Sequence, residues 1–207
     1  GFMALKVHEL WLGDAAGLPA PGNTITVSAL SSGINRLSFP KWEIVDWRIP
    51  ARGQLPPITI RWYNGPAPGV EELLDSVLQT APQQQRNNWR FAGTLVVGAN
   101  GTIHTTGHNM WFQLLPADRF AGVQCERPET VENSRGPEQD WFAACRGGPR
   151  PWANFDYASA LNEMLMLGNV ATQFDEPLEF DPVAMKIVNN AQADALLRCD
   201  YRQGWKL

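Results

Sequence analysis

Alternation of apolar and polar side chains in two neighbouring segments constrains the fold of this chain more than any other feature. Residues 42–49 (WEIVDWRI) follow the two-residue period of a β-strand, and residues 58–63 (ITIRWY) do so after a turn-rich loop. The pair therefore predicts an antiparallel hairpin with a long connection. In the first strand, the side that carries Val45, Trp47 and Ile49 is the better candidate for the core.

Similar patterns predict the other elements. Strands are expected over residues 24–30, 93–98, 102–105 and 110–115, with a tight hairpin turn at Asn100-Gly101. Helices are expected at residues 2–12, 70–78, 137–146 and from Asp156 to about Val170, and loops at residues 13–23 and 82–88. With 18 glycines, 16 prolines and nine tryptophans, the composition predicts one sheet-rich globular domain with a few helices.

The predicted helices also indicate which side chains are buried. In the helix that begins at Pro137, the apolar stripe is Trp141, Phe142 and Cys145. The apolar face of the next helix comprises Tyr157, Leu161, Met164, Leu165 and Gly168. Near the end of the chain, Tyr201 and Trp205 are expected to dock on the body of the protein.

Charge and composition exclude several classes of partner. The net charge is −4 and no basic stripe is present, so nucleic-acid binding is not expected. No uncharged segment is long enough to span a bilayer, so no membrane contact is expected. Three cysteines without a C-x-x-C motif predict buried free thiols. His104 and His108 lack a suitably spaced third ligand, so they are interpreted as surface histidines near a turn and not as a metal site.

Motifs that would carry catalysis or bind a cofactor are missing from the sequence. It contains no G-x-G-x-x-G for a dinucleotide, no G-x-x-x-x-G-K-[ST] for a nucleotide phosphate, no G-x-S-x-G and no H-E-x-x-H. No catalytic, cofactor-binding or metal-binding residue is therefore expected among these 207 residues.

Aromatic and basic side chains at strand ends are the first candidates for ligand binding. Trp62 and Tyr63 close a strand, where they are placed to stack on the apolar face of a sugar ring, or else to pack in the core. Arg48 and Arg52 lie near the neighbouring strand end. They are candidates to bind an acidic group of a ligand, or to pair with a nearby Asp or Glu.

Two polar residues at the start of a helix complete the candidate substrate-binding set. Asn154 and Asp156 open the predicted helix, and capping alone would explain both. Asp156 and Glu163 are seven residues apart on one helix face. The carboxylate pair of a glycosidase must lie across a cleft, so these two do not fit that role.

Three long segments resemble a known protein family. They are SSGIN…FPKWEIVDWRIPARGQLPPITIRWYNG, EQDWFAACRGGPRPWANFDYASALNEMLMLGNVA and LEFDPVAMKIVNNAQADALLRCDYRQGWKL. Together they resemble the C-terminal domain of a bacterial branch of the glucose–fructose oxidoreductase and inositol dehydrogenase family (Gfo/Idh/MocA). The last segment contains the D-P-x-x-x-x-x-x-N pattern and the Y-R-x-G-W end of that branch.

The resemblance implies an α+β fold, with a large, mostly antiparallel open sheet and helices packed on one face. It implies a substrate-binding and oligomerisation domain that acts on a sugar or polyol and forms homo-oligomers through the open sheet face. NAD or NADP would bind to an N-terminal Rossmann domain, which would carry E-K-P and be followed by D-x-x-x-H. Neither motif occurs in these residues, so the chain alone is expected to be inactive.

Two alternatives remain open at this stage. One is a stand-alone carbohydrate-binding or assembly module, and the other is part of an NAD-dependent glycoside hydrolase. Both a cytoplasmic and an exported location are compatible with the sequence.

Overall fold

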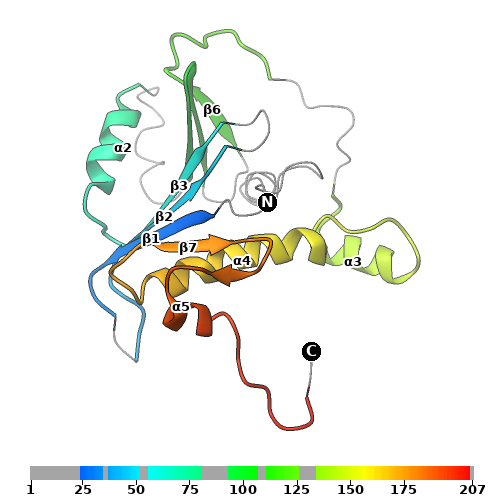
Figure 1. Ribbon diagram of the computed structural model, residues 1–207. Coiled ribbons are helices and arrows are strands. Elements are labelled where there is room, and N and C mark those ends of the chain that lie inside the picture. Colours follow the sequence, from blue (N-terminus) through cyan, green and yellow to red (C-terminus); the bar gives the residue numbers. More distant parts are fainter. Residues whose placement is uncertain are drawn as a thin grey trace. The chain divides into compact units, whose positions relative to one another are not determined.

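The computed structural model describes residues 24–34, 37–51, 56–80, 93–106, 111–125 and 134–205. The helix and the loops predicted over residues 2–23 and 82–88 lie outside these residues. Two antiparallel sheets and several helices confirm the predicted α+β class (Figure 1). The chain divides into two compact units, the first made of residues 1–6 with 68–158 and the second of residues 7–67 with 159–207.

A five-stranded sheet forms the framework of the second unit. Its strands, in spatial order, are β3 (Ile58–Asn64), β2 (Glu43–Ile49), β1 (Ile25–Ser31), β7 (Leu178–Asp181) and β8 (Lys186–Ile187). Strands β2 and β3 pair antiparallel, with Ile49 opposite Ile58 and Trp47 opposite Ile60, which confirms the predicted hairpin. On its other side, Trp47 lies opposite Val27 of β1.

One face of this sheet is packed against α4 (Phe155–Ala171) and α5 (Ala191–Ala195). Val45, Trp47 and Ile49 are at most 3% exposed, so the predicted core face is confirmed. Leu165, which the spacing predicts in the core, is 38% exposed. The helix instead buries Met164, Leu167, Gly168 and Ala171, which are spaced i, i+3, i+4 and i+7. Leu165 does not lie on this stripe.

The first unit contains a three-stranded meander and a helix. The strands are β4 (Gly93–Gly98), β5 (Gly101–Thr106) and β6 (Phe112–Leu115), and the helix α2 (Val70–Leu78) has the predicted bounds. Leu115 packs against Leu74 and Val77 of this helix. Gly98 pairs with Gly101, so the hairpin turn is Ala99-Asn100, one residue earlier than predicted. A Cβ at Gly101 would come within 2.7 Å of the Phe120 ring, which explains the glycine.

The helix α3 (Pro137–Cys145) begins and ends where its proline and glycine signals predict, but the predicted burial of its apolar stripe is wrong. All nine of its residues are described, and none is buried. Trp141 is 59% exposed and Phe142 is 46% exposed. Amphipathic spacing identifies the residues that share a helix face, but it does not determine whether another element covers that face.

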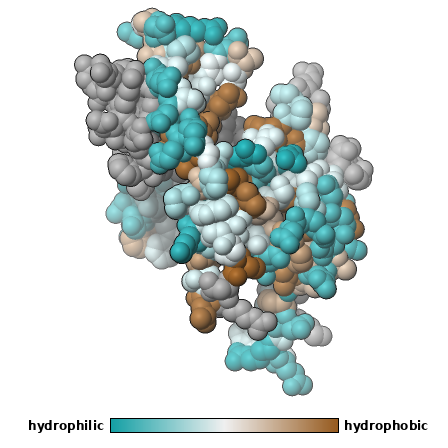
Figure 2. All heavy atoms as spheres, turned by 90° about the vertical axis from the view of Figure 1, so that its left-hand side faces the viewer, coloured by the Kyte–Doolittle hydropathy of each residue, from teal (hydrophilic) through white to brown (hydrophobic). Residues whose placement is uncertain are grey.

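Two further burial predictions are wrong. Tyr201 and Trp205 do not dock, since they are 53% and 63% exposed, and Arg202 lies over the Trp205 ring. The free thiols of Cys125, Cys145 and Cys199 are exposed and not buried. On the face drawn in Figure 2, brown apolar residues reach the surface at several places among hydrophilic ones. Across the described segments, no helix has the length and apolarity to cross a bilayer.

Candidate functional site

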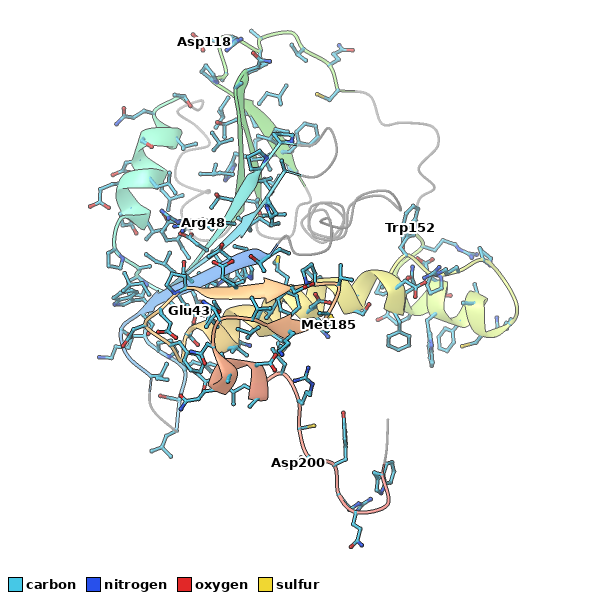
Figure 3. All side chains as sticks on the ribbon, in the orientation of Figure 1. Glu43, Arg48, Asp118, Trp152, Met185 and Asp200 are labelled. Atoms are coloured by element: carbon cyan, nitrogen blue, oxygen red, sulfur yellow. The ribbon has the colours of Figure 1, made fainter. Side chains whose placement is uncertain are left out.

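The face of the five-stranded sheet opposite the core carries a row of polar side chains from four strands. Cross-strand register places Thr59, Arg48, Thr26 and Glu179 side by side, and we call these four residues the Arg48 row. The hydroxyl groups of Thr24 and Thr26 donate hydrogen bonds to the Glu179 carboxylate at 2.5 and 3.1 Å. Arg48 of β2 is labelled in Figure 3.

A shallow pocket of about 390 Å³ lies over this row, lined by Thr24, Thr26, Arg48, Ile49, Pro50, Pro57, Ile58 and Thr59. Because Thr24 and Thr26 donate their hydroxyl protons to Glu179, the oxygens of these two hydroxyls face a ligand as acceptors. The guanidinium of Arg48 can only donate. The pocket therefore combines donors and acceptors with the apolar rings of Pro50 and Pro57.

An ion pair lies beside the arginine of this pocket. Arg61 binds Asp46 in a bidentate manner, with both N–O distances at 2.6 Å, and these hydrogen bonds raise the pKa of Arg61. The Arg48 guanidinium lies 3.9 Å from the Asp46 carboxylate, which confirms the pairing with an acid that the sequence left open. The Arg48 side chain nevertheless remains 57% exposed, and so it is still accessible to a ligand.

The candidate aromatic residues at the end of β3 point to opposite faces of the sheet. Trp62 pairs with Val45 and therefore shares the core side, where it is 42% exposed. Tyr63 pairs with Ile44, on the side of the Arg48 row. The two rings do not form one sugar-binding platform. Arg52, the third candidate in this part of the sequence, lies outside the described residues.

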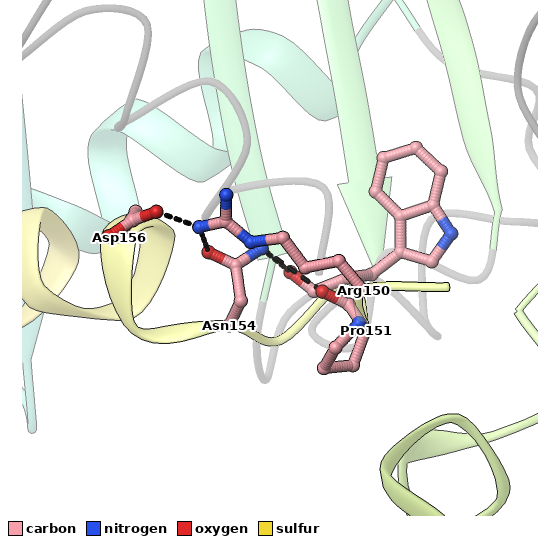
Figure 4. A network of polar contacts seen from close by, with 5 residues as sticks. Arg150, Pro151, Asn154 and Asp156 are labelled. Atoms are coloured by element: carbon pink, nitrogen blue, oxygen red, sulfur yellow. Dashed lines mark hydrogen bonds and ion pairs between the residues drawn. The ribbon is translucent and has the colours of Figure 1, made fainter. Parts of the chain in front are cut away.

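Asn154 and Asp156, by contrast, are brought together at the start of α4 by Arg150 (Figure 4). The Arg150 guanidinium donates to Asn154 Oδ1 at 2.5 Å and forms an ion pair with Asp156. Asn154 Nδ2 donates to the carbonyl oxygens of Pro151 and Trp152 at 3.0 and 3.3 Å. Arg150 and Asp156 are 58% and 79% exposed. This network orders the turn into α4. Because Arg150 and Asp156 neutralise each other, neither charge is left to attract a charged ligand.

Asn154 also occupies the capping position that the sequence predicts for it. It directly precedes the first residue of α4, and its backbone carbonyl accepts the N–H of Ala158 at 2.9 Å. Capping of α4 and the Arg150 network together account for Asn154, so the substrate contact remains a prediction only.

His104, which the sequence predicts at the surface, is instead 2% exposed in the middle of β5. Burial lowers the pKa of its imidazole, since the charged form loses hydration. His108 lies outside the described residues. Within the described residues, no group of three or more His, Cys, Asp or Glu side chains is positioned to hold a metal ion.

The described helix starts do not fit the pyrophosphate of a dinucleotide. Such a site needs backbone N–H groups at a helix N-terminus free of negative charge. The first turns of α2 and α3 carry two acids each, Glu71 and Glu72, and Glu138 and Asp140. The first turn of α4 carries Asp156. These carboxylates would repel the phosphates, so no cofactor chemistry is assigned to these helix starts.

Of the Arg48 row, the sequence predicted Arg48 as a candidate, while Thr26, Thr59 and Glu179 were missed for a topological reason. Thr26 and Glu179 are 153 residues apart and meet only because β7 pairs with β1. The alternating hydroxyls at Thr24 and Thr26 were the local signal that could have added to Arg48. No protein-family model matches the chain, and a search of curated proteins finds no significant match.

Proposed function

We propose that this chain is the substrate-binding part of an NAD(P)-dependent oxidoreductase that acts on a sugar or polyol, and that the substrate binds at the Arg48 row. The observation that carries the location is the pocket, in which an exposed guanidinium lies beside three threonine hydroxyls. The resemblance to Gfo/Idh/MocA proteins supplies the class of enzyme.

The chemistry of the pocket matches such a substrate. Sugar or polyol hydroxyls would donate to the oxygens of Thr24 and Thr26, while Arg48 would donate to a hydroxyl or carboxylate oxygen. Pro50 and Pro57 provide an apolar wall for the C–H side of the molecule. Hydride transfer would be the work of a nicotinamide bound elsewhere in the intact protein, so the role of this chain is to bind and orient the substrate.

Titration of the chain with small ligands tests this proposal. Tryptophan fluorescence and calorimetry would follow the addition of myo-inositol, glucose, gluconate and NADH in separate experiments. We expect saturable binding of at least one polyhydroxylated ligand, weakened about tenfold or more in Arg48→Met, since a charge-assisted hydrogen bond is lost. Arg135→Met, which removes an exposed arginine of the first unit, serves as the matched control and should not change binding.

Two results would contradict the proposal. Absence of any saturable binding that depends on Arg48 would contradict a substrate site at the Arg48 row. Tight binding of NADH to this chain would contradict the claim that the nicotinamide binds elsewhere in the intact protein. Product analysis of the full-length protein with and without NAD separates the oxidoreductase from a glycoside hydrolase, and the reading frame upstream of Gly1 separates it from a stand-alone module. A G-x-G-x-x-G motif there supports the oxidoreductase, whereas a signal peptide directly before Gly1 supports a stand-alone carbohydrate-binding module.

A further inference from the structure

The helix α3 presents an aromatic surface to solvent. Trp141 and Phe142 lie with their ring centroids 5.2 Å apart and their planes tilted by 40°. They are 59% and 46% exposed, and the thiol of Cys145 is exposed on the same side. Exposed aromatic clusters of this kind mark interaction surfaces more often than isolated apolar residues do. We call Glu138, Trp141, Phe142, Cys145 and Arg146 the α3 stripe.

The charges at the two ends of the α3 stripe indicate what covers it. Glu138 lies four residues before Phe142, and Arg146 lies four residues after it, so the three share one ridge of the helix surface. Glu138 and Arg146 are both exposed. A two-fold axis through Phe142 would place the acid of one copy against the arginine of the other. The stripe is thus complementary to itself in the antiparallel direction.

We propose that the α3 stripe binds the α3 stripe of a second copy of this chain. The two helices would cross antiparallel at Phe142, and each copy would supply the same surface, as in an isologous dimer. Trp141 and Phe142 would lose their contact with water, and the pair of Glu138 with Arg146 would form twice, once in each half of the interface. Antiparallel packing also opposes the two helix dipoles. An interface built on one helix of nine residues is small, so the dimer should be concentration-dependent.

Charge reversal provides the first test. Sedimentation velocity over a concentration series, under reducing conditions, would measure the dimer dissociation constant of the full 207-residue chain. Glu138→Arg and Arg146→Glu should each raise this constant about tenfold or more, because each places like charges together in both halves of the interface. The double variant Glu138→Arg/Arg146→Glu restores opposite charges and should restore dimerisation.

A matched control separates the interface from general charge effects. Glu72→Arg reverses an acid in the first turn of α2, as Glu138→Arg does in the first turn of α3, and should leave the dissociation constant unchanged. Circular dichroism of each variant would verify that α3 and the rest of the chain remain folded.

Disulfide crosslinking tests the direction of the helices. In a Cys125→Ser/Cys199→Ser background, Glu138→Cys should form a disulfide with Cys145 of the second copy under mild oxidation. Within one copy, positions 138 and 145 are about 10 Å apart along the helix axis, too far for a disulfide. The same background with Glu72→Cys should crosslink much more slowly.

The outcomes decide the proposal in either direction. Weakening by both single charge reversals, rescue by the double variant and a covalent dimer through positions 138 and 145 would support it. A chain that stays monomeric at the highest concentration measured would overturn it. A dimer that Leu30→Arg on the outer sheet face weakens, and that the α3 variants do not, would also overturn it and would place the contact on the sheet.

Discussion

The indole N–H of Trp47 donates a hydrogen bond to the backbone carbonyl of Met164 at 3.1 Å, across 117 residues of sequence. Trp47 stands at the centre of β2 and Met164 in the middle of α4, and both side chains are at most 5% exposed. This bond therefore fixes the position of the long helix on the five-stranded sheet. Gly168 lies one turn further along α4, and its Cα faces the same ring.

Replacement of Trp47 should destabilise the second unit strongly. Trp47→Phe removes the hydrogen bond and leaves a cavity where the larger ring was, so we expect a loss of about 2–3 kcal/mol in the free energy of unfolding. Urea unfolding followed by circular dichroism would measure it. Trp62→Phe, on the adjacent strand at a site that is 42% exposed, should cost less than about 1 kcal/mol. Equal losses at the two positions would refute the assigned role of Trp47.

Gly168→Ala should also be destabilising, although alanine favours helices. A Cβ at this position would lie 2.7 Å from Cζ2 of Trp47, so α4 would have to move away from the sheet. Overpacking of this kind costs about 1–3 kcal/mol, which exceeds the gain of about 1 kcal/mol in helix propensity. Asn162→Ala, at an exposed position of the same helix, should not destabilise the protein. A higher melting temperature for Gly168→Ala than for the unsubstituted chain would contradict this packing.

The ion pair of Arg61 and Asp46 should be worth more than an ordinary surface pair. Asp46 is 7% exposed and receives two hydrogen bonds at 2.6 Å, so Arg61→Met would leave a carboxylate that is poorly hydrated. We expect a loss of about 1–2 kcal/mol, moderated because the Arg61 side chain is half exposed. Asp46→Asn combined with Arg61→Met should recover part of the loss. A double-mutant cycle without coupling would disprove this assignment.

Acid should destabilise the first unit through His104. Burial lowers the pKa of this imidazole in the folded chain, so the unfolded chain, with a pKa near 6.5, binds the proton more tightly. The contribution to stability is therefore complete above about pH 6.5 and declines as the pH falls from there toward the folded pKa. Melting temperatures between pH 7.5 and 5 would reveal the decline, roughly within the titration range of histidine.

The control for this pH dependence compares histidine variants. His104→Gln should show a smaller fall in melting temperature on acidification than the unsubstituted chain, because it has no imidazole to protonate at that site. A variant with His8→Gln and His108→Gln should retain the full fall. An unchanged pH profile in His104→Gln would exclude His104 as the responsible group.

Local patterns predicted most of the described helices and strands before Leu178, but not β7, β8 or α5. The alternation in residues 42–49 and 58–63 predicted β2, β3 and their pairing, and the helical spacing of residues 70–78 predicted α2. Proline and glycine marked both ends of α3. These signals succeed because strand and helix periods, and the restricted dihedral angles of proline, act within a few residues of the chain.

Burial was predicted less well, because it depends on what the rest of the chain places over a face. The spacing of Trp141 and Phe142 was sound, yet no part of the described chain buries these rings. The hairpin of β4 and β5 was also correct in kind but shifted by one residue, since Gly101 is required by the nearby Phe120 and not by the turn.

The sequence by itself thus determined a sheet-rich domain with a few helices, the pairing of β2 with β3 and the bounds of α2 and α3, since these follow from local periodicity and turn chemistry. Only the tertiary structure decided that Glu179 meets Thr26 beside Arg48, that Trp62 and Tyr63 face apart, and that α3 remains uncovered by the described chain. The physical reason is that strand pairing and packing join residues more than a hundred positions apart. No local pattern determines which distant strand or helix packs against a given segment.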